Sequence, residues 1–169
     1  YGFFALYMRD LEYSGQQTGI FIALGVLAEV GIFLIARRLI SQFGVWNLLF
    51  VSIALTGLRW YVMAAFADTF MVIVLSQLIH ALSFGLTHAV SVHFIHQFLP
   101  KAYHSRGQAV YISVAFGLGG AFGNYMAGQQ WQQGTNAYET FFTAAVFAIV
   151  GALSLLLCSK KDMDESKAV

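Results

Sequence analysis

The residues best suited to chemistry lie in a long apolar stretch between Met71 and Pro100. No Asp, Glu, Lys or Arg interrupts this stretch, which exceeds the roughly 20 apolar residues that a helix needs to cross a bilayer. Polar side chains nevertheless recur within it, and such groups usually face a protein interior or an aqueous path. They are Gln77, His80, Ser83, Thr87 and His88. The steps of three and four residues from Gln77 to Thr87 predict a membrane helix with one hydrated face.

Two further ionisable residues, Glu29 and Arg59, lie inside other apolar segments. At about 1.5 Å of rise per residue, Glu29 lies roughly 15 Å, Arg59 roughly 12 Å and His80 roughly 14 Å from the expected outer end of its helix. An isolated charge at such a depth costs at least ~2.5–3.5 kcal/mol, so pairing is the natural relief. We expect the three groups to converge near the midplane, with Glu29–Arg59 as the first choice of ion pair and His80 beside it.

These three groups could form a proton-linked binding site. Histidine titrates near neutral pH, and a solute that competes for Arg59 would change the proton affinity of Glu29, which couples the two binding events. The alternative interpretation is a structural ion pair that fixes the register of the helices. His88 lies closer to the inner side and either lines the path or hydrogen-bonds to a neighbouring helix.

Other chemistries find little support. The H-x-x-H spacing of His93 and His96 lacks a third ligand, so we expect no metal site. The single cysteine, Cys158, excludes a disulfide within the chain. No motif of a nucleophilic enzyme or metalloprotease is present, so we expect no enzymatic activity and no cofactor, with a proton gradient as the driving force.

Composition indicates an integral membrane protein. The chain has 169 residues, of which 59% are hydrophobic and only 10% charged, and its mean hydropathy is +0.69; soluble domains carry about 25% charged residues. The apolar runs are continuous, whereas a β-barrel would show alternating segments. The net charge of +1, without a basic patch outside short loops, gives no reason to expect a nucleic-acid partner.

The chain divides into apolar segments and short polar connections. The end of one helix is expected at 1–8, and complete membrane helices at 19–36, 45–67, 71–100, 108–130 and 139–158. Polar loops are expected at 9–18 and 131–138, basic loops at 37–44 and 101–107, a tight turn at 67–69, and a solvated tail at 159–169. The fold class is therefore an all-α membrane bundle with five full transmembrane helices and the end of a first, formed by residues 1–158. Because the chain opens in mid-pattern without Met, we expect it to be the C-terminal part of a longer protein.

The charges predict an orientation. Of the nine Lys and Arg residues, seven fall on one side of the bundle: Arg37, Arg38, Lys101, Arg106, Lys160, Lys161 and Lys167. The other side receives Arg9 alone, since Arg59 lies within a helix. The positive-inside rule places the two basic loops and the C-terminus in the cytoplasm.

The segment 108–130 carries a ladder of small residues. Ala115, Gly119, Gly123 and Ala127 recur every four residues, and Asn124 belongs to a parallel row and is a further candidate for solute binding. Such rows let helix backbones approach closely. We expect this face to pack against another helix; the alternative is a flexing point during a transport cycle.

Several segments together suggest a family. They are LEYSGQQTGIFIALGVLAEVGIFLIARRLISQFG at 11–44, LTGLRW at 55–60, QLIHALSFGLTHA at 77–89 and SRGQAVYISVAFGLGGAFGN at 105–124. In this order they resemble the C-terminal half of major facilitator superfamily transporters, and most of all the phenylpropionate permease group, which is related to nucleoside–proton symporters and to lactose permease. The resemblance covers nearly the whole chain.

The resemblance implies two six-helix bundles around a central cavity, of which this chain holds the second. Residues 71–100 would be the tenth helix, which lines the cavity, and Glu29, Arg59 and His80 would stand on the helices that carry proton-coupling groups in such transporters. The implied function is secondary active transport by alternating access, with proton symport of a small organic solute such as phenylpropionate, a nucleoside or a sugar, in a bacterial inner membrane. The implied partners are the N-terminal half of the same protein, the solute and the bilayer. The alternative is a non-transporting scaffold or receptor on the same fold.

Overall fold

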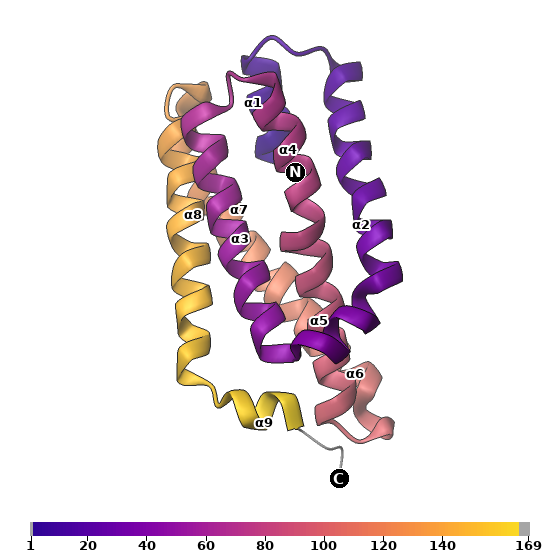
Figure 1. The fold of residues 1–169 in the computed structure, drawn as a ribbon. Helices are drawn as coiled ribbons and strands as arrows, with labels where there is room; N and C mark the ends of the chain where they lie inside the picture. Colours follow the sequence, from indigo (N-terminus) through magenta and orange to yellow (C-terminus); the bar gives the residue numbers. More distant parts are fainter. Residues whose placement is uncertain (1, 166–169) are drawn as a thin grey trace.

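The structure, a computed structural model, describes residues 2–165 as an antiparallel bundle of helices (Figure 1). The α-helices are α1 (Gly2–Asp10), α2 (Gly15–Phe43), α3 (Val45–Phe66), α4 (Phe70–His80), α5 (Leu86–Phe98), α6 (His104–Ile112), α7 (Gly119–Trp131), α8 (Ala137–Ser154) and α9 (Lys160–Glu165). Two π-helical turns, η1 (Ala81–Gly85) and η3 (Ser113–Leu118), join α4 to α5 and α6 to α7 without a break. Single 3₁₀ turns are η2 (Lys101–Tyr103), η4 (Gln132–Gly134) and η5 (Leu155–Leu157).

The predicted fold class is confirmed. Within the described residues there is no strand, and helix covers each of the five predicted spans and the end of a first. Four helices are long and apolar enough to cross a membrane, namely 15–43, 45–66, 70–98 and 137–157. The fifth predicted span corresponds to the helix from His104 to Trp131, which is continuous but rich in glycine and amide side chains.

Two predicted loops are helical instead. Helix α2 continues through the basic segment 37–44 as far as Phe43, because no helix-breaking residue precedes Gly44, whose φ of 77° ends the helix. The second basic loop, 101–107, shrinks to the turn η2, and α6 already begins at His104. Arg37, Arg38 and Arg106 therefore lie in helices and not in loops.

The polar loop at 9–18 is also shorter than predicted, because a capping box starts α2 at Gly15. The Ser14 hydroxyl accepts a hydrogen bond from the Gln17 backbone N–H at 3.2 Å, and the Gln17 side chain accepts one from the Ser14 N–H at 2.9 Å. The sequence carries the signal for this cap in its Ser-x-x-Gln spacing.

Residues 160–165 of the predicted solvated tail form the short helix α9, whose Lys160, Lys161, Asp162 and Glu165 are exposed while its other side docks on the bundle. The Trp46 backbone N–H donates to Asp164 Oδ1 at 3.0 Å, and Gln97 Nε2 donates to the Asp164 carbonyl oxygen at 3.0 Å. Met163 packs against the apolar cluster around Val45. One short helix thus ties the start of α3 to the end of α5; residues 166–169 of the predicted tail lie outside the described residues.

Helices α3 and α8 pack closely around one glycine. A Cβ added at Gly57 would stand 2.6 Å from Ile149 Cδ1 and 3.2 Å from the Ala145 carbonyl oxygen, so the two backbones approach at this point. At the end of the bundle away from α9, Trp131 and Phe141 are buried with Tyr7 of α1 beside them. The first short helix is thereby fixed to α7 and α8.

The small-residue ladder is not packed against another helix of the described chain, contrary to our expectation. Gly119 and Gly123 are exposed, and a Cβ added at Gly123 would meet nothing within 4 Å. Gly119, Gly123 and Ala127 line an open crevice of 340 Å³ with α8, whereas Ala115 lines a separate cavity. The reason is that Phe122 of α7 and Phe147 of α8 meet edge to face at 6.3 Å and keep the two helices apart.

The two predicted basic segments and α9 lie at the same end of the bundle, as Figure 1 shows. Contacts confirm this arrangement, because Lys160 Nζ donates to Asn47 Oδ1 at 3.0 Å and Gln108 contacts His96 at 2.8 Å. The basic segments that the sequence assigns to one side of the bundle therefore lie together at one end of the structure.

Candidate transport site

A cavity of 410 Å³ lies at mid-length of the bundle between α3, the α4–η1–α5 helix and the α6–η3–α7 helix. Its walls combine ionisable, hydroxyl and aromatic side chains. They include Thr56, Arg59, Trp60, His80, Ser83, Phe84, Thr87, His88, Tyr111 and Phe116. The hydrated face predicted for residues 71–100 thus becomes one wall of this cavity, apart from Gln77.

The π-helical turn η1 arranges the rings on that wall. A π turn inserts one extra residue into a helix and is frequent at functional sites. Here His80 stacks on Phe84 with ring centroids 5.1 Å apart, and Phe84 stacks on His88 at 6.5 Å, each pair within 11° of parallel. The second π turn, η3, brings Phe116 edge-on to Phe84 at 5.7 Å. Two irregular turns therefore face each other across the cavity.

The half-buried acid of the site, Glu29, pairs with a buried histidine. Glu29 Oε1 lies 2.9 Å from His80 Nε2, and the two side chains are only 13% and 7% exposed. The structure thus brings Glu29 into contact with His80, which we expected beside a Glu29–Arg59 pair. His80 lines the cavity and Glu29 lies behind it, so the imidazole stands between the carboxylate and the cavity.

Two glycines allow α2 to reach this position. A Cβ added at Gly85 would stand 3.2 Å from Glu29 Cγ, and one added at Gly25 would stand 3.1 Å from Gln77 Oε1. At each of these glycines, the missing side chain leaves room for a polar side chain of the neighbouring helix. This contact explains why Gln77, which is fully buried, faces α2 and not the cavity.

Arg59 belongs to the opposite wall. It is 5% exposed, and its guanidinium carbon lies 3.9 Å from the centre of the Trp60 ring, a cation–π contact. Trp60 in turn stacks on Phe141 of α8 at 5.2 Å, which fixes the ring. Trp60 therefore supports the arginine from inside the bundle.

Hydrogen bonds connect the walls. Thr87 Oγ1 donates to Ser52 Oγ at 2.8 Å, joining α5 to α3. The Tyr111 hydroxyl lies 3.4 Å from His88 Nδ1, joining α6 to α5. His88 thus has both of the properties that the sequence left open, since it lines the cavity and contacts a neighbouring helix.

Asn124 does not reach this cavity. It is exposed, and its amide Nδ2 donates to the Gly120 carbonyl oxygen of its own helix at 2.9 Å. Sequence reasoning missed Ser52 and Tyr111, because hydroxyl groups inside apolar helices carry no spacing signal of their own. It missed Phe116 because the π turn that aims this ring has no recognisable pattern in the sequence.

Chemically, the site can exchange protons and hold an organic ion. The carboxylate and the imidazole lie at hydrogen-bond distance and can share one proton. Formal charges on Glu29 and Arg59 cancel while His80 is neutral, so one added proton leaves one net positive charge at the cavity. Aromatic walls offer flat apolar surfaces to a ring-bearing solute.

Comparison with known families decides the identity of this fold. The MFS_1 like family matches residues 1–144 of the chain. The chain belongs to this family. This match confirms the family that the sequence resembles.

Two curated proteins of this family are similar to the chain. A protein named "Maltose permease" from Geobacillus stearothermophilus is 30% identical over 165 residues, which is 95% of this chain and 40% of that protein. A protein named "Probable 3-phenylpropionic acid transporter" from Escherichia coli (strain K12) is 32% identical over 132 residues, 78% of this chain and 34% of that protein. The chain therefore spans well under half the length of these relatives. No solved structure matches the chain.

Proposed function

We propose that this chain is one half of a secondary transporter that moves a small organic anion together with a proton. The single observation that carries the proposal is the largely buried contact of Glu29 with His80, at a cavity whose opposite wall holds Arg59. Ionisable groups at this depth are costly and mark ion or proton pathways in membrane proteins. The N-terminal six-helix half of the same protein would close the cavity from the other side.

Coupling follows from charge. When the Glu29–His80 pair takes up a proton, the summed charge of the pair and Arg59 becomes positive, and in a medium of low dielectric a carboxylate solute offsets it strongly. When the solute leaves, the retained proton is disfavoured by the positive Arg59 nearby and is released. Proton and anion therefore bind more strongly together than separately, which is the thermodynamic definition of coupling.

The lining favours an aromatic acid over a sugar or nucleoside as the solute. An arginine fork binds a carboxylate with two hydrogen bonds, and Phe84, Phe116 and Trp60 present rings to the same cavity. Sugars are held mainly by hydrogen-bonding groups, and the hydroxyl side chains Ser83 and Thr87 are already engaged with backbone or neighbouring hydroxyl groups. The cavity volume lies within the range of small-molecule sites.

The orientation of the transporter follows from the charged end. Since the end that holds Arg37, Arg106 and α9 carries the excess of basic residues, we place it in the cytoplasm of a bacterial cell with the bundle in the inner membrane. The organic acid and the proton would then enter together down the proton gradient.

The test is uptake by the full-length protein in proteoliposomes with an imposed pH gradient, using 3-phenylpropionate, maltose and uridine as probes. We expect accumulation of the aromatic acid, loss of accumulation in Glu29→Gln, and retained exchange of internal for external solute, because exchange need not release the proton. Glu139→Gln, a change at an exposed glutamate in the first turn of α8, is the matched control and should accumulate normally. Accumulation by Glu29→Gln at the wild-type level, with equal protein in the membrane, would leave Glu29 only a structural role.

A further inference from the structure

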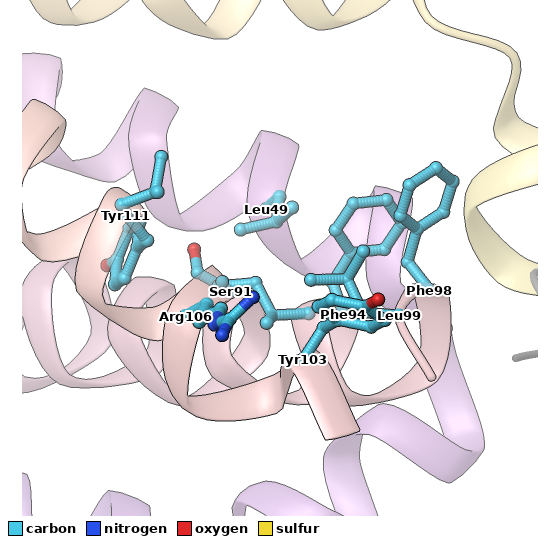
Figure 2. A pocket seen from close by; sticks show the side chains of 11 residues that line it. Leu49, Ser91, Phe94, Phe98, Leu99, Tyr103, Arg106 and Tyr111 are labelled. Atoms are coloured by element: carbon cyan, nitrogen blue, oxygen red, sulfur yellow. The ribbon is translucent and has the colours of Figure 1, made fainter. Parts of the chain in front are cut away.

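An apolar groove of 610 Å³ opens at the basic end of the bundle, between α3, α5 and α6 (Figure 2). It is distinct in character from the cavity described above, because nearly all of its lining is hydrocarbon. Leu49 lies at its base, and Phe94, Phe98 and Val110 line it. The last two are 57% and 63% exposed, so the groove opens outward from the membrane-spanning helices of the described chain.

One charged group belongs to this groove. Arg106 lines it, and its guanidinium carbon lies 5.7 Å from the centre of the Tyr103 ring, which is itself half exposed. Figure 2 shows the arginine among the apolar side chains of α5 and α6. Among residues 2–165 no carboxylate lies within ion-pair distance of Arg106, since the described ion pairs join other residues. Its charge is therefore available to an anion from outside.

Length and position match a lipid. The lining of α5 extends from Ser91 to Phe98, roughly 10 Å along the helix axis, which leads from the level of the arginine into the hydrocarbon core. A groove with a cation at the membrane surface and apolar walls below fits a headgroup phosphate above an acyl chain. Basic side chains near the cytoplasmic surface attract anionic lipids, and Arg binds phosphate through two parallel hydrogen bonds.

We propose that this groove, defined by Leu49, Phe94, Phe98, Tyr103, Arg106 and Val110, is a binding site for an anionic phospholipid. The phosphate lies on Arg106, and one acyl chain lies along Phe94 and Val110. Because lipid tails are as apolar as the groove, burial supplies little net free energy in a bilayer. Selectivity for an anionic lipid therefore comes from the charge of Arg106, while the apolar walls of the groove determine where the acyl chain lies.

The experiment uses the purified full-length protein in detergent with palmitoyl-oleoyl phosphatidylglycerol or the corresponding phosphatidylcholine, and counts retained lipid by native mass spectrometry. We expect preferential retention of phosphatidylglycerol and about a fivefold loss of it in Arg106→Gln, which corresponds to ~1 kcal/mol per basic residue at a membrane surface. Arg106→Lys keeps the charge and should retain more lipid than Arg106→Gln. Arg38→Gln, at an exposed arginine of α2, is the matched control and should behave as wild type.

A second measurement places the lipid. A photoactivatable phosphatidylglycerol in proteoliposomes is expected to crosslink to peptides within 91–110, and Ser91→Phe, which fills the groove without changing charge, should reduce that crosslinking. Equal retention of the two lipids, or equal retention in Arg106→Gln and Arg38→Gln, would overturn the proposal. So would crosslinking that leaves 91–110 unlabelled, which would show that the other half of the transporter covers the groove. None of these readouts depends on transport.

Discussion

The Glu29–His80 pair can be tested as a unit of stability by changing each residue to leucine, singly and together. The two side chains are 13% and 7% exposed and 2.9 Å apart, so each single change leaves a polar partner in an apolar environment. Removal of one partner from such a buried pair costs about 3–5 kcal/mol, whereas replacement of both by apolar groups is often close to neutral. The side chain of Glu29 also contacts Gly85, which limits relaxation.

We therefore expect Glu29→Leu and His80→Leu each to lower the free energy of unfolding by about 3 kcal/mol, the low end of that range because the pair is not completely buried. The double variant should be more stable than either single variant. The assay is reversible unfolding in mixed micelles followed by tryptophan fluorescence, with all four proteins in the same detergent. If the single effects add, with a coupling energy under about 0.5 kcal/mol, the pair does not act as a unit and our description of the site is wrong.

Three further predictions concern the bundle. Gly57→Leu should lower stability by about 1–3 kcal/mol because its side chain meets Ile149 and the α8 backbone, while Gly123→Leu in the open crevice should melt as wild type; equal melting temperatures for the two variants would contradict the packing described. Asp164→Ala should cost about 1 kcal/mol through loss of the acceptor at the start of α3 and should speed trypsin cleavage after Lys160 and Lys161, unlike the control Asp162→Ala; unchanged cleavage would show that α9 is not held by this contact. Deletion of Leu82 should turn η1 into an ordinary α-helical turn that leaves α4 and α5 in place but reduces the spacing of His80 and Phe84 from four residues to three, which breaks their stack; uptake should be lost although the protein reaches the membrane, and normal uptake would mean that the stack of His80, Phe84 and His88 is dispensable.

Much of the fold follows from hydrophobicity alone. Continuous apolar runs fixed the number and order of the long helices, and the uneven placement of basic residues predicted that 37–44, 101–107 and α9 share one end. Helix ends were less predictable. Arg37 and Arg38 look like loop residues by charge, yet both are good helix formers and nothing before Gly44 stops the helix.

The depth of the ionisable residues in the bundle could be predicted from the sequence, but which of their side chains meet could not. Counting residues along three helices brought Glu29, Arg59 and His80 to one level, yet rotation about each helix axis decides which side chains meet. That rotation depends on Gly25 and Gly85, where α2 comes close enough to place Glu29 on His80. The ladder at Gly119 and Gly123 shows the converse, because small residues permit close packing but larger neighbours decide whether it occurs.

The most direct test of the account is proton movement that accompanies solute entry. In weakly buffered proteoliposomes containing the full-length protein, 3-phenylpropionate added outside without an imposed gradient should make the external medium more alkaline as solute and proton enter together. Glu29→Gln should admit labelled solute in exchange for internal solute but produce no alkaline shift, and Glu139→Gln should behave as wild type. An undiminished alkaline shift with Glu29→Gln would contradict the central claim that the Glu29–His80 pair carries the transported proton.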